Sequence, residues 1–502
     1  MGQSITREAD RATAALDSVE RQVDSAWESL RPRLVELGRA LQEQRLAPAV
    51  FLHLELQLFG LLREFGRVLL ERLLNGLEGD GRSLPHDVIF EGQGYRRLGK
   101  KTRNAHVATL FGTICLWRFG YRFWEPHIKE SCIFPLERQL GLIEGATPAL
   151  ADYVGRRMAE AGATQRRVLQ ELREERGVSL GVKRLRKLVA ALSDGLAQQR
   201  QPAQVEALLE ALRQAEFRRG NRKPVLAVGR DGVTLCEYQY RFWEVATTAT
   251  VTVFDRSGRR LTTVYLAWRP ELGQATMSQM LTDLLTDVLR QWEGPLPTLA
   301  YVADSGGQES NYFQDVLAVM RHPHTGERLS WQRVVDFYHA AERVWTMAEA
   351  LFGTDNPRYQ RWARRMLRLL KRKPRGAKRV LHSAAALAAR RQMSKSRVQA
   401  FRKAYNYIRK RTQWMKYSEY KQRHIPLGSG ITEAACKTVF TERLKLSGMR
   451  WKKTGAQQVL TLRTILLSHT WQDTYARMLD THAASLPRPY IPGTLKDARK
   501  AA

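Results

Sequence analysis

The stretch "KPVLAVGRDGVTLCEY" (residues 223–238) decides the fold, because its run of small and β-branched apolar residues is typical of a buried strand. Its two glycines, Gly229 and Gly232, leave room for the close approach of another part of the chain. Later segments predict two strands joined by a turn, a helix, a strand, a helix and a last strand, within 245–268, 277–292, 297–307 and 331–340. Three successive strands followed by alternating helices and strands predict an α/β arrangement with a mixed sheet.

Two aspartates of this region lie where ligands gather in such sheets. Asp231 stands within the first strand, and Asp304 follows the fourth strand in "YVADSGG". Ligands bind at the carboxyl ends of strands, so both side chains are expected to reach one pocket if the first and fourth strands are neighbours. Two Mg²⁺ ions about 3.5 to 4 Å apart, or Mn²⁺ in their place, would offset the repulsion between the carboxylates and activate a water or a 3′-hydroxyl for phosphodiester chemistry.

A third ligand is predicted in "PLGSGITEAACKTVF" (residues 426–440), where a glycine turn leads into a short helix with Glu433 near its start. A metal cage of this kind needs a ligand from a helix that packs back across the sheet, and Glu433 meets that need. Glu442, nine residues on, is the rival. An ion pair within the helix, to Arg443 or Lys445, is the simpler account of Glu442.

Each of the three acids also has a structural interpretation. Asp231 would be a turn residue, although the apolar residues on both sides of it argue against a turn. Asp304 would be the N-cap of a following helix, and Glu433 would complement a helix dipole. The conjunction of the three acids, rather than any one of them, favours a metal site.

The charge of the chain indicates a polyanionic partner. Its 502 residues include 82 Lys and Arg against 50 Asp and Glu, a formal net charge of +32. Double-stranded DNA is the preferred partner. An anionic membrane surface is the alternative, but no run of 18 apolar residues would span a bilayer and no segment is typical of an export leader. The four cysteines lack zinc-ligand spacing and favour a reducing, intracellular setting.

The excess charge is concentrated after residue 340. From Arg358 to Ser418 there are 21 Lys or Arg and no Asp or Glu, interleaved with apolar residues at helical spacing. This pattern predicts folded helices with one positively charged side that fits a duplex backbone. The DNA-binding candidates here and in the segment after Glu433 are Arg364, Arg368, Lys371, Arg372, Lys373, Lys437, Arg443, Lys445 and Arg450.

The first 80 residues differ, with 13 acids, 10 arginines and no lysine. Their apolar residues recur at helical spacing on both sides of Pro48, so a pair of helices is expected, and self-association is its preferred role. The next segment predicts a small antiparallel sheet. Beyond it, a helix, a turn at Gly177 and a second helix after an N-cap Ser179 are compatible with a helix-turn-helix. The DNA-binding candidates on that second helix are Lys183, Arg184, Arg186 and Lys187.

Five motifs between about residues 220 and 470 resemble transposases of the DDE class with an RNase H-like core, and most closely the Kra-type group of bacterial insertion sequences. They are "GRDGV" (229–233), "ADSGG" (303–307), "VVDFYHAAERVW" (334–345), "GSGITEAACKTVFTERLKLSGMRW" (428–451) and "GAQQVLTLRTILLS" (455–468). The resemblance implies a multidomain α+β protein whose RNase H-like core is interrupted by an all-helical insertion. Charge and residue patterns, together with this resemblance over about 220–470, divide the chain into the expected domains 1–80, 81–145, 146–200, 220–340, 341–425 (insertion), 426–475 and a tail, 476–502.

By this resemblance Asp231, Asp304 and Glu433 are the catalytic metal ligands, and "DFYH" supplies the supporting residues Asp336 and His339. Asp336 is the rival second ligand, but the order of strands reaches Asp304 first. Many members of the group carry a cysteine zinc motif in the β-rich segment, and this sequence has none at "SLPHDVIFEGQGYRR" (83–97). A module without zinc, held by its apolar core, is therefore expected.

The resemblance implies a transposase that binds terminal inverted repeats, cleaves DNA at 3′ ends and joins those ends to target DNA. The partners would be double-stranded DNA and a second copy of the chain, in a homodimer or higher oligomer, with no membrane. The location would be the cytoplasm, at the bacterial nucleoid. An RNase H-like endonuclease without strand transfer and a domesticated, non-catalytic DNA-binding protein are the alternatives.

Overall fold

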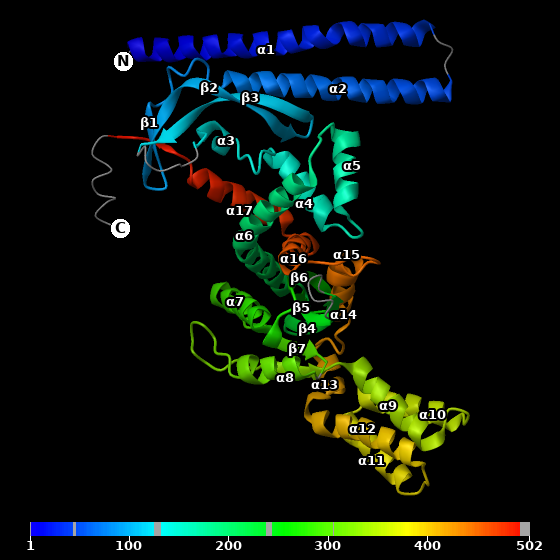
Figure 1. The fold of residues 1–502 in the computed structure, drawn as a ribbon. Coiled ribbons are helices and arrows are strands. Elements are labelled where there is room, and N and C mark those ends of the chain that lie inside the picture. The colour runs from blue at the N-terminus through cyan, green and yellow to red at the C-terminus, as the bar shows by residue number, and fades with distance from the viewer. Residues whose placement is uncertain (1, 44–46, 125–131, 237–242, 305, 492–502) are drawn as a thin grey trace. The chain divides into compact units, whose positions relative to one another are not determined.

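The computed structural model describes residues 2–43, 47–124, 132–236, 243–304 and 306–491 (Figure 1). The chain divides into two compact units. The first comprises Met1–Met158, Ala163–Gly195 and Tyr475–Ala502, and the second comprises Ala159–Gly162 and Leu196–Thr474. No helix in the described ranges is long and apolar enough to cross a membrane.

A five-stranded mixed sheet forms the centre of the second unit. Its strands are β4 (Val225–Cys236), β5 (Trp243–Phe254), β6 (Arg260–Trp268), β7 (Thr298–Ala303) and β8 (Gln332–Val335), in the order β6-β5-β4-β7-β8. The first three strands pair antiparallel, whereas β4, β7 and β8 run parallel. The predicted mixed sheet is confirmed. The first and fourth strands, β4 and β7, are neighbours.

Alternate residues of the parallel strands face two different cores. Leu226 and Val228 of β4 pack with the C-terminal part of α6 (Val182–Phe217) and with α7 (Ala275–Gln291). Val225 and Ala227 face the opposite side, towards the helices that follow β8. The period of two along a strand therefore gives this sheet one face covered by α6 and α7 and another covered by later helices.

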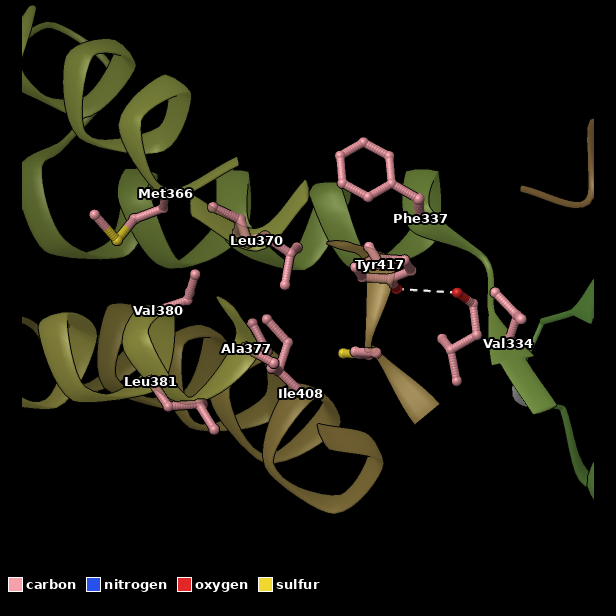
Figure 2. Packing of buried hydrophobic residues seen from close by; sticks show 14 of the residues in the cluster. Val334, Phe337, Met366, Leu370, Ala377, Val380, Leu381, Ile408 and Tyr417 are labelled. Carbon is pink, nitrogen blue, oxygen red and sulfur yellow. Dashed lines mark hydrogen bonds between the residues drawn. The ribbon is translucent and has the colours of Figure 1, made fainter. Parts of the chain in front are cut away.

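Five helices follow β8 and pack on one another around an apolar core. They are α9 (Phe337–Phe352), α10 (Arg358–Arg372), α11 (Gly376–Ala388), α12 (Lys395–Arg411) and α13 (Tyr417–Gln422), with a 3₁₀ turn at Thr412–Trp414. Figure 2 shows Met366 and Leu370 of α10 facing residues of α11 and α12 in this core. Tyr417 of α13 donates a hydrogen bond of 2.9 Å to the carbonyl of Val335, which ties the group to β8. The prediction that the basic tract folds into helices is confirmed.

The remaining helices of the second unit are short or lie near the sheet edge. Before α7 there is a 3₁₀ turn, Leu272–Gln274, and after β7 come α8 (Gly307–Tyr312) and a π-helical turn, Phe313–Leu317. After α13 come α14 (Gly430–Ala435), a π-helical turn (Cys436–Thr441), α15 (Glu442–Leu444) and α16 (Lys453–Leu467). The predicted glycine turn and the short helix carrying Glu433 are confirmed.

The first unit contains the predicted helical pair and the predicted small sheet. The pair is α1 (Gly2–Glu43) and α2 (Pro48–Gly76), and the sheet contains β1 (Asp87–Phe90), β2 (Gln93–Thr109) and β3 (Gly112–Phe123). A strand near the C-terminal end, β9 (Arg488–Pro489), pairs antiparallel with β1. Helices α3 (Pro135–Gln139), α4 (Pro148–Ala159) and α5 (Gln165–Arg176) follow the sheet in the chain.

Three expectations about boundaries are wrong. The expected domain 146–200 ends within α6, which continues through Pro202 to Phe217. The turn at Gly177 is present and left-handed (φ 64°), but the second helix begins at Val182 instead of directly after Ser179. The expected C-terminal tail contains most of α17 (Trp471–Ala484) and the strand β9, while residues 492–502 lie outside the described ranges.

Candidate functional site

Three aspartates lie level with one another just beyond the parallel pairing of β4, β7 and β8. The pairing of β4 with β7 ends at Val228 and Tyr301, and Asp231 and Asp304 each stand three residues beyond that pair. The pairing of β7 with β8 ends at Ala303 and Val335. Asp304 directly follows Ala303, and Asp336 directly follows Val335. Continued register therefore places Asp231, Asp304 and Asp336 in one row.

The row faces the side of the sheet on which α14 lies. Asp231 and Asp304 are an even number of residues from Ala227 and Val302, which pack in the core opposite α7, so their side chains share that face. On this face α14 approaches β4 closely at Gly229. A Cβ atom at Gly229 would lie 1.9 Å from Oγ1 of Thr432. Thr432 Oγ1 also lies 2.7 Å from Oγ1 of Thr250 on β5, and together these contacts hold the helix that carries Glu433.

Asp231 is bound by two donors of the protein. The backbone N–H of Gly232 donates to its Oδ1 at 2.7 Å, and the thiol of Cys436 donates to its Oδ2 at 3.2 Å. Burial, and next the charge of Asp231, raise the pKa of the Cys436 thiol well above its ordinary value, so the thiol keeps the proton that it donates. Cys436 thus links the segment after α14 to the first aspartate of the row.

Asp336 is fully buried and anchors two parts of the chain. Its Oδ1 accepts hydrogen bonds from the backbone N–H groups of Tyr338 (2.5 Å) and His339 (3.0 Å), which makes it the N-cap of α9. Its Oδ2 accepts from the backbone N–H and from the hydroxyl of Ser429. Four donors therefore engage this carboxylate, and the rival second ligand acts as a structural anchor.

Glu433 is joined to this anchor through Ser429. The Ser429 hydroxyl lies 2.7 Å from Oε1 of Glu433 and 2.7 Å from Oδ2 of Asp336. Because a hydroxyl has one proton, it donates to one of the two carboxylates at a time. Nε2 of His339 lies 3.8 Å from the same Glu433 oxygen. The Glu433 side chain is nevertheless 48% exposed, so it is open to a ligand.

Asp304 is exposed, and a tyrosine of the helical group reaches it. The hydroxyl of Tyr407, on α12, donates to its Oδ1 at 3.1 Å. The charge of the same carboxylate acts on His339. Burial alone would lower the pKa of His339, but the charges of Asp304 and Asp336 and a contact with Glu342 outweigh burial, so this pKa is raised. Asp304 and the supporting residue His339 therefore belong to one electrostatic environment.

Glu309 is a further acid in this environment that sequence reasoning missed. It lies in the first turn of α8, and burial raises its pKa, with the charges of Asp231 and Asp304 adding to the increase. The negative charges of both aspartates therefore reach the Glu309 carboxyl group and favour its protonated form. Its position just after "ADSGG" is the signal in the sequence that would have drawn attention to it.

Ser429 and Cys436 were missed as well, although their spacing contains a signal. They stand four residues before and three residues after Glu433, which is the spacing of neighbours on one helix face. Tyr407 carries no such signal, because 103 residues separate it from Asp304. Only the packing of α12 brings the two together.

The donor set fits a hard divalent cation. Carboxylate oxygens are the ligands that Mg²⁺ and Mn²⁺ prefer, and Asp231, Asp304 and Glu433 present them from β4, from the end of β7 and from α14. In the described part of the chain, no group of three or more His, Cys, Asp or Glu side chains is close enough to hold a metal ion as it stands. The metal cage therefore stays a prediction.

Most of the predicted DNA-binding residues lie on the surface. In the first unit Lys183, Arg186 and Lys187 are exposed, whereas Arg184 is half-buried and donates to the backbone carbonyls of Glu144, His106 and Gly145. In the second unit the exposed members are Arg364, Arg368, Arg372, Lys373, Lys437, Lys445 and Arg450. Lys371 is half-buried, with its ammonium 5.0 Å from the ring centre of Phe337.

Arg443 corrects the expectation for its segment. It is 1% exposed, its guanidinium lies 5.2 Å from the ring centre of Trp451, and burial lowers its pKa to about 10. A side chain withdrawn from solvent in this way supports the packing after α14 and does not present a surface for DNA.

The rival third ligand, Glu442, faces a different partner from the one expected. Its Oε2 accepts a hydrogen bond of 3.5 Å from Arg463 on α16, instead of pairing with Arg443 or Lys445 within its own segment. The Arg463 side chain is 4% exposed, so this pair belongs to the packing of α16. The Glu442 side chain thus pairs with α16, whereas Glu433 is linked through Ser429 to Asp336 of the aspartate row, which favours Glu433 as the third ligand.

No protein-family model matches this chain, and no curated protein is similar enough to count as a match.

Proposed function

We propose that the chain is a DNA transposase of the DDE class, similar to the Kra-type group, with an RNase H-like core interrupted by a helical insertion. One observation supports this most strongly: Asp231 and Asp304 each stand three residues beyond the last pair of the parallel strands β4 and β7, on the face where α14 carries Glu433. The strand order β6-β5-β4-β7-β8, with β5 antiparallel to its neighbours, is the arrangement that the proposal requires of the core.

In this proposal Asp231, Asp304 and Glu433 hold two Mg²⁺ ions, for which Mn²⁺ substitutes. Bound Mg²⁺ stabilises charge on the scissile phosphate and activates a water or a 3′-hydroxyl. The other residues position these three acids. Asp336 and Ser429 fix the turn before Glu433, and Cys436 holds Asp231 by its thiol proton.

The substrate would be double-stranded DNA: the terminal inverted repeats of the element and its target, in the cytoplasm at the bacterial nucleoid. The exposed basic residues of α10 and of the segment after Glu433 lie in the same unit as the acids, and would hold the duplex at the site. The helix-turn-helix residues Lys183, Arg186 and Lys187 would contact the terminal repeats.

The salt dependence of DNA binding tests the role of the basic helices. Each phosphate contact contributes about −0.9 to the slope of log K against log salt. Replacing both Arg364 and Arg368, which are exposed and one turn apart on α10, by Gln should make the slope shallower by about 2. Fluorescence anisotropy with a labelled 30-base-pair duplex between 50 and 300 mM NaCl would measure it.

Arg213 supplies the matched control, because it is also exposed but pairs with Glu210 on α6. Arg213→Gln should leave the slope as in the unchanged protein. An unchanged slope in the Arg364 and Arg368 variant would remove α10 from the DNA-binding surface.

Strand transfer separates the proposed activity from that of an endonuclease. DNA ends that are already cut, from the sequences flanking the gene, are incubated with Mg²⁺ and a supercoiled plasmid. A transposase joins the 3′ ends to the plasmid. An endonuclease leaves them unjoined, and a domesticated DNA-binding protein binds them without cutting or joining.

We further propose that the helical pair α1 and α2 joins two copies of the chain. Among its described side chains the pair buries Ala26, Leu30 and Leu61. Six large apolar side chains of α2 are each at least 40% exposed: Phe51, Leu52, Leu56, Leu58, Phe59 and Leu62. A groove opens between the two helices beside Gly60. Exposed apolar surface of this extent on a helical pair is typical of a half-bundle that packs against another.

The charge of α1 and α2 favours a second copy of the chain, rather than DNA, as the partner that binds this apolar surface. Residues 1–80 carry 13 acids and 10 arginines in a chain that is otherwise strongly basic, so a polyanion gains nothing from this surface. A two-fold dimer sets the same mixture of Arg and Glu against itself, which is self-complementary. Two such pairs would form a four-helix bundle.

Leu56→Glu should therefore convert a dimer into a monomer, because it places a charge at the centre of the apolar stripe. Sedimentation velocity at micromolar concentration would measure the mass. Leu272→Glu is the control, since Leu272 is 99% exposed in the second unit, far from α2 in the chain. A monomeric unchanged protein, or a dimer that persists in Leu56→Glu, would contradict this contact.

A further inference from the structure

Two arginines and a tyrosine form a cluster beside Asp304 that the metal site does not use. The guanidinium carbon of Arg411 lies 4.1 Å from the ring centre of Tyr407, and that of Arg343 lies 5.0 Å from it. The hydroxyl of the same tyrosine donates to Asp304. The Tyr407 ring therefore lies against two guanidinium groups, and its hydroxyl contacts the candidate catalytic carboxylate of Asp304.

The elements explain why these groups meet. Arg343 lies on α9, the helix that begins directly after Asp336. Tyr407 and Arg411 are one turn apart near the end of α12. Helices α9 and α12 pack on each other around buried residues such as Val344 and Ile408. The apolar core of the helical group thus fixes the spacing of the two guanidinium groups.

The cluster has an excess of positive charge for its degree of burial. Arg343, Tyr407 and Arg411 are all half-buried, and Nε of Arg343 has no hydrogen-bond partner within the described residues. A buried N–H group without a partner costs free energy, which an acceptor from a ligand would recover. The charge of Arg411 also contributes, after burial, to lowering the pKa of nearby Arg333. These observations favour an anionic ligand.

We infer that Arg343 and Arg411, braced on Tyr407, bind a nucleotide phosphate next to the phosphodiester that reacts. A guanidinium group binds two phosphate oxygens at once, and two guanidinium groups held on one ring concentrate positive charge where a phosphate of the DNA strand would lie. Tyr407 is then a positioning residue with two separate tasks. Its ring holds the arginines, and its hydroxyl orients Asp304. The inference rests on the proposed function for the identity of the reacting group, but not for the binding of phosphate.

Inorganic pyrophosphate is the probe, because it presents two linked phosphates without a base or sugar. Calorimetric titration of the full chain in EDTA, which removes metal, should show binding that Arg343→Gln and Arg411→Gln each weaken by about tenfold or more. Arg409→Gln is the matched control. It is exposed on α12 two residues from both Tyr407 and Arg411, hence on the other side of the helix, and should bind pyrophosphate as the unchanged protein does.

The two tyrosine variants separate the ring from the hydroxyl. Tyr407→Phe keeps the ring and should bind pyrophosphate within about twofold of the unchanged protein, while kcat for DNA cleavage falls and KM stays constant. Tyr407→Ala removes the brace and should weaken pyrophosphate binding like the arginine variants. Thermal unfolding of each variant checks that the helical group is intact.

Unchanged pyrophosphate affinity in folded Arg343→Gln and Arg411→Gln would overturn the inference, as would an equal loss in Arg409→Gln. Its failure is distinguishable from failure of the proposed function. If Asp304→Asn abolishes cleavage while the arginine variants bind as before, the inference alone is wrong. If Asp304→Asn cleaves normally while the arginine variants lose pyrophosphate, the proposed function is wrong and the phosphate site stands.

Discussion

Glu433→Gln is expected to lower the rate of Mg²⁺-dependent DNA cleavage by at least about 100-fold, the upper end of what the loss of a partner around a metal ligand costs. The substitution keeps the size of the side chain and its contact with Ser429, but removes the negative charge that a divalent cation requires. DNA binding in EDTA should stay within about twofold, because the basic residues that hold the duplex are unchanged. Single-turnover cleavage and anisotropy would measure the two effects.

Glu442→Gln is the matched control for this result. It makes the same chemical change nine residues further on, at an acid that pairs with Arg463. Cleavage should stay near the rate of the unchanged protein, with a small loss of stability from the ion pair. If Glu442→Gln abolished cleavage and Glu433→Gln did not, the assignment of the third acid would have to be reversed.

Gly229→Ala is expected to destabilise the second unit and to displace α14 from β4. The added Cβ would lie 1.9 Å from Oγ1 of Thr432 and 3.0 Å from Oγ1 of Thr250, and both threonines are buried. Overpacking of this kind costs about 1–3 kcal/mol. Because α14 must move away from β4, Glu433 should leave its position, and cleavage should fall even where the protein stays folded.

Thermal unfolding and cleavage would be measured together, with Gly455→Ala of α16 as the control, since nothing lies within 4 Å of a Cβ there. The double variant Gly229→Ala with Thr432→Ala removes the closest contact and should recover part of both losses. A Gly229→Ala protein with unchanged unfolding temperature and cleavage would show that α14 does not depend on this approach.

The sequence predicted the parts of the fold that local patterns determine. The apolar runs of β4, β5, β6, β7 and β8 predicted the strands and their order along the chain, and the glycines before Glu433 predicted the turn and short helix. Asp231 and Asp304 were identified because the first lies within, and the second directly follows, an apolar run that is typical of a strand. The neighbouring positions of β4 and β7 then placed them level with each other.

The sequence failed where packing overrides local signals. Proline in a helix interior is unfavourable by about 3 kcal/mol, and the domain expected at 146–200 ends just before Pro202. The long apolar stripe of α6 overcomes that cost, and Pro202 lies within the helix. Arg443 was predicted on the surface from its charge, but it is buried against Trp451. Because Trp451 lies eight residues after Arg443 in the chain, the sequence alone does not show that the two side chains pack together.

The links between the acids were also beyond local patterns. Ser429, Asp336 and Glu433 meet although Asp336 lies 93 residues before Ser429. Tyr407 reaches Asp304 across 103 residues through the packing of α12 on α9. Such contacts depend on the whole helical group, whose separate helices the sequence predicted but whose arrangement it did not.

The binding of Mn²⁺ tests the central claim most directly, because it does not depend on knowing the DNA sequence. Electron paramagnetic resonance of free Mn²⁺ would give the number and affinity of bound ions in the full chain. The proposal predicts two ions, and an affinity at least about tenfold weaker when Asp231→Asn, Asp304→Asn or Glu433→Gln removes one of the three acids, as expected for damage to a metal site. Equal stoichiometry and affinity in the unchanged protein and in all three variants would contradict it.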